Sequence, residues 1–464
     1  MVSSAAMVAA VFGGFGQAAQ AQAKTTLHLF LGSVGAIDKD KAQVQAFMDK
    51  NPDINVQIVL APTSATDILA VIQQDLAAKS GDIDIYQFDT IWPGILADNL
   101  VDLTKPIADA KIDTSVYYPR LFSNDNVAGK QVGMPWFTDA GILYYRTDLL
   151  KKYGFDHPPK TWTELESMAT TIQTGEKKTN PDFWGFVFQG NSYEGLTCDA
   201  LEWQYSNGGG SIVESDGTIS VNNPAAAAAI DRAAKWVGTI SPPGVTSYQE
   251  EDARGVFQAG NAAFMRNWPY AYVLGNGGAD GTGSTKVKGL FNVEPLPAGD
   301  SGHGAAALGG WQLGVSTYSA NQAAAEKLVF FLTSPEQEKW RALNESELPS
   351  VKSLYTDPEI AKTVPFIANL VPVFENASPR PSTITAAKYN DVSVAYFSAV
   401  HDVLTGKSDA KTSLGNLEIK LKQILGSGFK VGPVPAAAGA SATMAATMAS
   451  GSSMSATMAA TAAK

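Results

Sequence analysis

The strongest constraint on the fold is a regular alternation of strand and helix patterns near the start of the chain. Residues 25–31 alternate in hydrophobicity as a strand does, and residues 37–53 carry apolar side chains at helical spacing. A second strand pattern at 54–60, a helix pattern from 66 and a third strand pattern at 82–89 follow. This β-α-β-α-β order predicts a mostly parallel sheet covered by helices.

Local signals place the helices more finely. Thr66 stands where a helix N-cap is expected, and one helical face is predicted for Ile68, Leu69, Val71, Ile72 and Leu76. Later helix starts are marked by a capping residue or by proline at the first helical position. These starts are Thr161, Asn223-Pro224, Ser334-Pro335 and Asp357-Pro358. We therefore predict an α/β protein from residue 24 to residue 430.

The charge balance and the few cysteine and histidine residues exclude several function classes. The chain has 464 residues, enough for two or three domains, and 45 acidic against 34 basic residues. The net charge of -11 argues against a nucleic-acid or anionic-membrane partner. A single cysteine, Cys198, is expected to be a small buried residue, and the four histidines lie too far apart to suggest a metal site. We expect no cofactor.

Both ends of the chain differ from the rest. Residues 1–23 carry no charge and end in an Ala-x-Ala pattern, which is typical of a secretory signal peptide and too short for a membrane span. We expect an exported mature protein that begins at Lys24 and does not insert into the membrane. Residues 431–464 are rich in Ala, Ser, Thr and Met, and this composition predicts a disordered tail.

Acidic and aromatic residues recur together in predicted loops. Asp89 ends a predicted buried strand, which is where open α/β sheets place their ligand crevice, although helix capping is the alternative. Asp139 follows an aromatic pair, and residues 264–272, FMRNWPYAY, hold three rings. The same theme recurs at Tyr193-Glu194, Trp311 and Arg380. Each residue alone fits a protein core, but their joint occurrence beside Gly and Pro favours a binding site.

The chemistry of this set fits a carbohydrate. Aromatic rings stack on the apolar faces of sugar rings, while carboxylates and arginine form charge-assisted hydrogen bonds with hydroxyl groups. Two carboxylates in a sugar cleft are also the equipment of a glycoside hydrolase. That alternative is weakened because the strand-helix pattern does not repeat eightfold as in a barrel. A receptor for a polyol or a cationic solute is a further alternative.

These segments resemble, in order, the sugar-binding proteins of ABC importers, specifically the trehalose/maltose-binding type. The resemblance spans residues 24–425 and lies in DIDIYQFDTIWPGILADNLVDLT, GMPWFTDAGILYYRTDLL, YEGLTCDALEW, GNAAFMRNWPYAY, LGGWQLGVS, FLTSPEQEKWRAL and ELPSVKSLYTDPEI. It implies a two-lobed periplasmic-binding-protein fold, with a hinge, a ligand cleft and closure of the lobes around the solute. It also implies a monomeric, periplasmic receptor, not an enzyme, whose partners are a sugar and the membrane permease subunits.

The resemblance further implies lobe boundaries and sugar contacts. The N-terminal lobe would comprise 24–138 and 309–352, and the C-terminal lobe 139–308 and 353–430. The implied contacts are Ser33, Gly35, Ser64, Asp89, Asp139, Tyr193, Glu194, Trp268, Tyr270, Gly310, Trp311 and Arg380. The three carboxylates would accept hydrogen bonds from hydroxyls, the arginine would donate them, and the indoles and Tyr270 would stack. Ala36-Ile37 stands where relatives often carry a glutamate, so the resemblance does not name the sugar.

Overall fold

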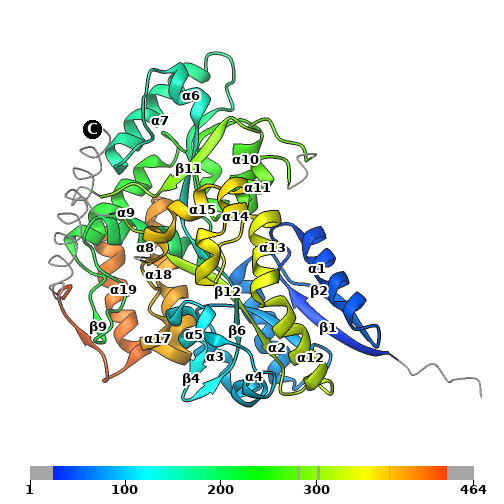
Figure 1. Ribbon diagram of the computed structural model, residues 1–464. Helices are drawn as coiled ribbons and strands as arrows, with labels where there is room; N and C mark the ends of the chain where they lie inside the picture. Colours follow the sequence, from blue (N-terminus) through cyan, green and yellow to red (C-terminus); the bar gives the residue numbers. More distant parts are fainter. Residues whose placement is uncertain (1–23, 279–282, 300–303, 376, 436–464) are drawn as a thin grey trace, which may run out of the picture.

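The described part of the chain is built on two separate sheets, which define two lobes (Figure 1). The structure, a computed structural model, describes residues 24–278, 283–299, 304–375 and 377–435. The signal peptide predicted at 1–23 and most of the predicted tail, 436–464, lie outside the described residues.

The first lobe contains a five-stranded sheet. Its strands, in spatial order, are β2 (Ile54–Leu60), β1 (Thr25–Leu31), β3 (Ile85–Asp89), β12 (Leu308–Val315) and β6 (Met134–Ala140). β1 runs parallel to β2 and β3, which confirms the predicted β-α-β-α-β order. β12 returns from far along the chain and pairs antiparallel with both β3 and β6. This late strand therefore lies within the sheet, between strands that come much earlier in the sequence.

The second lobe contains a four-stranded sheet of mixed direction. Its strands, in spatial order, are β11 (Phe291–Pro295), β7 (Ile142–Arg146), β10 (Ala262–Asn267) and β8 (Trp184–Val187). β7 pairs antiparallel with β10 and β11, whereas β10 and β8 are parallel. The segment 264–272 thus begins in the inner strand β10 and leaves the sheet at Asn267.

Amphipathic helices pack on the first sheet. The longer ones are α1 (Ile37–Lys50), α2 (Ala65–Ala77), α12 (Gln322–Leu332) and α13 (Pro335–Glu345). Two local predictions for α2 are wrong. Ser64, not Thr66, is the N-cap, because its Oγ accepts the Asp67 amide at 3.4 Å. Val71 is 39% exposed, because it lies beside the face that buries Ile68 and Ile72.

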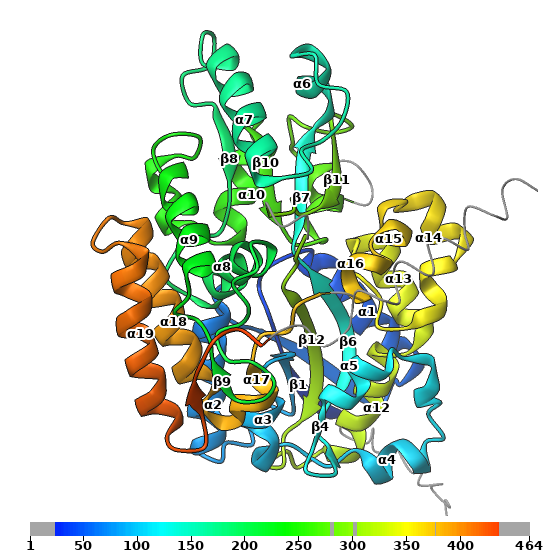
Figure 2. The ribbon, with the colours of Figure 1, turned by 90° about the vertical axis from the view of Figure 1, so that its left-hand side faces the viewer.

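The second lobe is dominated by helices and by a cluster of tryptophans. Its longer helices are α7 (Trp162–Glu176), α8 (Glu194–Ser206), α9 (Pro224–Trp236), α10 (Glu250–Gln258), α18 (Tyr389–Leu404) and α19 (Ala410–Leu425). Figure 2 shows α18 and α19 beside α8 and α9, although about 150 residues of sequence separate the pairs. Trp162, Trp203 and Trp236 are buried, and the Trp236 ring centroid lies 5.5 Å from that of Trp162 and 5.6 Å from that of Trp203.

Shorter elements complete the two lobes. They are α3 (Pro93–Leu96), α4 (Thr104–Asp109), α5 (Pro119–Asn124), α6 (Thr147–Lys152), α11 (Ala271–Gly275), α14 (Pro358–Thr363), α15 (Phe366–Asn369), α16 (Val371–Glu375), α17 (Ser382–Thr385), β4 (Asn126–Val127), β5 (Lys130–Gln131), β9 (Thr218–Ile219) and β13 (Lys430–Val431). β13 pairs in parallel with β9. The disordered tail predicted from 431 therefore does not begin at that residue.

The chain passes between the lobes in three adjacent segments. The first is Gly141, which alone separates β6 from β7. The second leads through Ala307 into β12, and the third passes through Ser378. The amide of Gly141 donates to the Ala307 carbonyl at 3.4 Å. The second and third segments are joined by two hydrogen bonds, from the Leu308 amide to the Ser378 carbonyl at 3.0 Å and from the Ser378 amide to the Ala306 carbonyl at 2.8 Å. These hydrogen-bonded crossings are the hinge of the two-lobed fold.

A buried ion pair lies directly under the hinge. A Cβ atom on Gly141 would lie 1.9 Å from Glu202 Oε1 and 2.6 Å from Arg266 Nη2, so only glycine fits there. The Ala307 amide donates to the same Glu202 oxygen at 3.1 Å. The crossing segments are therefore packed and hydrogen-bonded against the Arg266–Glu202 pair.

We predict that Gly141→Ala lowers the free energy of unfolding by about 1–3 kcal/mol or more, because the methyl group displaces a buried ion pair. Chemical denaturation would measure the change. Gly415→Ala is the control, because nothing lies within 4 Å of a Cβ there and the residue is inside helix α19. The control should raise stability by about 0.5–1 kcal/mol. If the two substitutions changed the free energy of unfolding equally, close packing of Gly141 against the ion pair would be contradicted.

Candidate functional site

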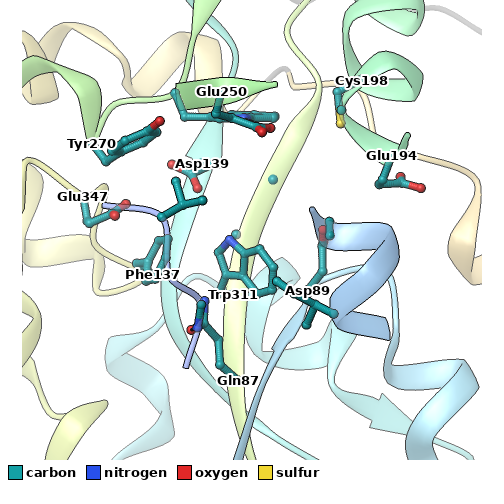
Figure 3. Close-up of a pocket in the computed structure, with 18 of the residues that line it drawn as sticks. Gln87, Asp89, Phe137, Asp139, Glu194, Cys198, Glu250, Tyr270, Trp311 and Glu347 are labelled. Carbon is teal, nitrogen blue, oxygen red and sulfur yellow. Dashed lines mark hydrogen bonds between the residues drawn. The ribbon is translucent and has the colours of Figure 1, made fainter. Parts of the chain in front are cut away.

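A cleft between the two lobes holds about 770 Å³ of empty space, including the part that opens to solvent. This volume is within the range of small-molecule sites, roughly 300–1,000 Å³. Eight of the sequence-predicted contacts line it: Asp89, Asp139, Glu194, Trp268, Tyr270, Gly310, Trp311 and Arg380. Figure 3 shows Asp89 and Glu194 on one side, Asp139 and Tyr270 on the other, and Trp311 between them. The structure thus brings together residues from distant parts of the chain.

The sheet register places one row of residues across the cleft floor. Trp311 of β12 lies opposite Asp89 of β3 and Phe137 of β6. Directly opposite residues of paired strands point to the same face of a sheet. The Trp311 ring is held edge-on by buried Trp92, with ring centroids 5.7 Å apart. Asp89, Trp311 and Phe137 therefore present a carboxylate and two rings side by side.

The two glycines before Trp311 make room for this arrangement. Gly310 has a φ of +131°, and a Cβ there would lie 2.8 Å from the Phe137 carbonyl oxygen. A Cβ on Gly309 would lie 2.9 Å from Asp139 Cβ and 3.2 Å from the Trp268 ring. The LGGW sequence is therefore required for close approach of β6 and of Trp268 to β12.

Arg380 joins the two lobes at one end of the cleft. It lies just beyond the third crossing and is 4% exposed. Its Nη2 donates to Asp89 Oδ1 at 2.7 Å, and its Nη1 donates to Glu194 Oε1 at 2.9 Å. Asp89 belongs to the first lobe and Glu194 to the second. Asp89 is thus an ion-pair partner, so the alternative that it only caps a helix is wrong.

Glu194 is held by more than the arginine. Tyr389 donates to its Oε1 at 2.5 Å and Ser393 donates to its Oε2 at 2.6 Å. The Glu194 amide also donates to Thr66 Oγ1 of the first lobe at 3.1 Å. Burial raises the pKa of Glu194, while Arg380 and the two hydroxyls oppose that rise. The carboxylate is therefore fixed in place by donors to both of its oxygens.

The indole of Trp268 stacks on Arg266, which forms the buried ion pair beneath the hinge. Its ring centroid lies 3.9 Å from the guanidinium carbon of Arg266, in a cation–π stack. Arg266 is 1% exposed and its pKa is raised, because Asp199 and Glu202 outweigh the opposing effect of burial. Trp268 Nε1 also lies 3.4 Å from Glu250 Oε1, which accepts its hydrogen bond. One face of the indole is thus packed, and its position is fixed.

The rings of the segment 264–272 have different roles. Tyr270 lines the cleft, and its hydroxyl donates to Glu251 Oε1 at 2.7 Å. Tyr272 instead packs in the core, with its ring centroid 4.6 Å from that of Phe366 and 5.4 Å from that of Phe291. Trp268 and Tyr270 therefore belong to the cleft, whereas Tyr272 does not.

The remaining predicted contacts lie around the cleft but are not among its lining residues. Ser33 and Gly35 belong to the loop after β1, where Gly32 and Val34 line the cavity instead. Ser64 caps α2, between the lining residues Thr63 and Ala65. The Tyr193 hydroxyl donates to Glu250 Oε2 at 2.7 Å, and its ring is buried.

Sequence reasoning missed several lining residues. The main polar and aromatic ones are Gln87, Phe137, Glu250 and Glu347, and Cys198 also lines the wall as a buried thiol. Gln87 lies two residues before Asp89, so strand alternation could have found it. The residues that flank Glu250 and Glu347 in the sequence do not distinguish these two from glutamates on the surface.

Two carboxyl groups in the cleft lack partners. Oδ1 of Asp139 and Oε2 of Glu347 are buried and have no hydrogen-bond partner among the described residues. Burial raises the pKa of both groups well above the usual range, with a further rise at Asp139 from Asp89 and at Glu347 from Asp139. Both residues line the cleft, but these two oxygens are covered in the structure, so a ligand that donates hydrogen bonds to them would have to reach them by local rearrangement.

Neither a cluster of metal ligands nor a membrane-spanning helix is found among the described residues. In the part of the chain that the structure describes, no group of three or more His, Cys, Asp or Glu side chains is arranged to hold a metal ion. No helix among residues 24–278, 283–299, 304–375 and 377–435 is long and apolar enough to cross a membrane. The side chains that line the cleft offer hydrogen bonding, ion pairing and ring stacking.

Comparison with known proteins identifies the family. Residues 35–339 match the family model of the bacterial extracellular solute-binding proteins, which is well over half of the chain. The chain belongs to this family. It is the solute-binding component of an ABC transporter, and its function is binding, not catalysis. Family membership implies a small-molecule ligand, permease subunits as partners and an extracellular or periplasmic location.

Individual relatives support this assignment. A probable ABC transporter-binding protein of Deinococcus radiodurans is 48% identical over 425 residues, covering 91% of this chain and 99% of the relative. The solved structure of maltose-bound MalE3 of T. maritima is 39% identical, with a TM-score of 0.81, and covers 86% of this chain and 100% of that one. The galactooligosaccharide-binding protein of Bacillus subtilis is 25% identical over 391 residues, 81% of this chain and 85% of the relative.

We predict that Arg380→Met destabilises the solute-binding protein by about 3–5 kcal/mol, because it leaves Asp89 and Glu194 buried without a cation. The pKa of Glu194 is already raised by burial and would rise further, so the folded state of the variant binds a proton more tightly than the unfolded chain does. The loss of stability should therefore be largest at about pH 8, where Glu194 is ionised, and smaller at about pH 5, where it is protonated in the variant. Denaturation at both pH values measures it, and a pH-independent loss would contradict the ion bridge.

Proposed function

We propose that this solute-binding protein captures a sugar in the cleft and delivers it to an ABC importer. The ligand class is a disaccharide such as trehalose, maltose or a related α-glucoside. The predicted contacts that line the cleft would bind it directly: Asp89, Asp139, Glu194, Trp268, Tyr270, Gly310, Trp311 and Arg380. Ser33, Gly35, Ser64 and Tyr193 would support these contacts from the surrounding loops and the layer beneath.

The observation that carries this proposal is the pairing of rings and acids around one cavity. Trp268, Tyr270 and Trp311 line the same space as Asp139 and Glu347. Rings of this kind cover the apolar faces of a pyranose, and carboxylates accept hydrogen bonds from its hydroxyls. The similar MalE3 of T. maritima has maltose bound, which supports the same ligand class.

Capture by closure agrees with the contacts between the lobes. Besides the Arg380 bridge, Thr63 Oγ1 of the first lobe donates to Gln249 Oε1 of the second at 3.3 Å. We take the parts of the chain divided by the crossings at Gly141, Ala307 and Ser378 as the two bodies that rotate about the hinge. The third boundary then lies at 378, not at 352 as predicted from the resemblance. The closed form of a monomer would then be recognised by the permease. Export by the signal peptide at 1–23 would bring the receptor to its periplasmic location.

Calorimetric titration against trehalose, maltose, sucrose, a longer maltodextrin and glucose tests the proposal. We expect micromolar or tighter binding of at least one disaccharide, about 8 kcal/mol of binding free energy, with no product formed. The affinity should be almost independent of salt, because the ligand is neutral. Failure of the whole panel to bind would contradict a sugar receptor. Salt-sensitive binding of a polyamine would instead favour a receptor for cations.

Trp311→Ala should weaken binding of that disaccharide by about 1–3 kcal/mol, because a stacking surface is lost. The fold should persist, since Trp311 is only partly buried. Trp184→Ala is a matched control, because Trp184 is also partly buried but lies in β8, outside the cleft lining. Titration of both variants measures the difference, and equal losses would exclude Trp311 from the site.

A further inference from the structure

Two carboxyl groups in the cleft form a pair that the protein itself leaves unsatisfied. Thr138 of β6 pairs with Leu348 in an antiparallel bridge, and its amide donates to the Leu348 carbonyl at 2.9 Å. Asp139 and Glu347 each stand one residue from this bridge, and both line the cavity. The charge of Asp139 raises the pKa of Glu347, so the two carboxyl groups act on each other. Figure 3 shows both beside Phe137 and Tyr270.

The position of Glu347 is fixed from both sides. The preceding residue, Ser346, is in the left-handed conformation with a φ of +56°, and its Oγ donates to the Pro269 carbonyl at 2.8 Å. The Val273 amide donates to the same hydroxyl at 3.2 Å. The following residue, Leu348, is anchored to β6. The backbone of Glu347 is therefore held between the hinge strand and the segment that carries Tyr270.

The other acids of the cleft are already paired. Asp89 and Glu194 share Arg380, and Glu250 accepts hydrogen bonds from Tyr193 and Trp268. Like charges that act on each other in a buried site are destabilising, and buried polar atoms are normally hydrogen-bonded. Two neighbouring acids that each leave one buried oxygen without a partner thus have a stability cost that a bound donor would reduce.

We propose that Asp139 and Glu347 form a carboxylate grip that accepts hydrogen bonds from two hydroxyls of one sugar unit, with Glu347 as a specificity-determining residue. This inference rests on the proposed function and deepens it. Tyr270 and Trp268 cover the face of the same unit, while Arg380, Asp89 and Glu194 hold the opposite end of the ligand. A sugar that lacks either hydroxyl leaves one of the two acids buried without a partner.

The grip makes sugar binding depend on pH. Hydroxyl donors favour the ionised carboxylates, so a proton competes with the sugar, and the affinity falls as pH falls through the raised pKa values of the pair. Other charged groups act on these two acids: Asp89, Glu250, Arg266 and Arg380 on Asp139, and Arg341 and Asp40 on Glu347. Arg341 lowers the pKa of Glu347, but its ion pairs are with Asp40 and Glu345.

Titration of Glu347→Gln with the disaccharide that the wild-type protein binds tests the proposal. We expect affinity at neutral pH to fall about tenfold and its pH dependence to become shallower, because a neutral amide replaces a charged acceptor. The thermal unfolding temperature without ligand should be unchanged or higher, because the like-charge pair is gone. Glu336→Gln, on the exposed side of the helix α13, is the control and should change neither quantity.

A series of monodeoxy sugars on the wild-type protein gives a second measurement that needs no variant. One or two analogues should lose affinity, and their binding should depend less on pH than that of the parent sugar. Equal affinities of Glu347→Gln and wild type, with the same pH dependence for all analogues, would overturn the grip. In that case the sugar still binds, whereas failure of the proposed function would show as no binding to the wild-type protein at all.

Discussion

The buried guanidinium of Arg266 is the interaction on which both the hinge and the binding surface depend. It pairs with Glu202, whose carboxylate accepts the Ala307 amide of the second crossing and packs against Gly141 of the first. The indole of Trp268 also stacks on this guanidinium, with the ring centroid 3.9 Å from the guanidinium carbon. A charge this deeply buried is tolerated only because Asp199 and Glu202 neutralise it. The crossing segments and the stacking ring are therefore positioned by the same group.

The cleft divides its acids into two sets with different tasks. Asp89 and Glu194 come from different lobes and share Arg380, so they tie the lobes together and need no ligand for charge balance. Asp139 and Glu347 each leave one buried oxygen without a hydrogen-bond partner among the described residues. Local arrangements that reduce stability are common at functional sites, where a ligand completes them. In the proposed site, the unpartnered oxygens of these two acids are where a bound hydroxyl would complete the hydrogen bonding of the cleft.

Much of the fold follows from local sequence signals. The strand and helix patterns of residues 25–89 predict the parallel half of the first sheet, and Pro224 and Pro358 mark helix starts correctly. The position of β12 between β3 and β6 has no local signal, because it depends on pairing with strands much earlier in the chain. Thr66 is a misleading cap signal because Thr63, Ser64 and Thr66 all stand near the start of α2. In the structure Ser64 caps the helix, whereas Thr66 Oγ1 accepts the Glu194 amide.

The site was predictable to the extent that its residues stand in distinctive surroundings. Asp89, Trp268 and Trp311 lie beside Gly, Pro or other aromatic residues, and the structure places all three at the cleft. Glu347 follows a polar helix end and looks like a surface residue in the sequence. In the structure, the bridge between Leu348 and Thr138 brings the backbone of Glu347 next to β6, and the residue lines the cleft together with Asp139. Similarly, Arg266 stands in the same segment as Trp268, but its role beneath the indole depends on Glu202 from α8.

A sugar that occupies the cleft with its hydroxyls on the unpartnered acids would be visible in a crystal structure of the protein with its tightest-binding disaccharide. We expect a pyranose stacked on Trp268 and Tyr270, with two of its hydroxyls within hydrogen-bond distance of Asp139 and Glu347. Arg380 would remain bound to Asp89 and Glu194. A sugar bound outside the cleft, or one whose hydroxyls leave both acids without a partner, would contradict this model of binding.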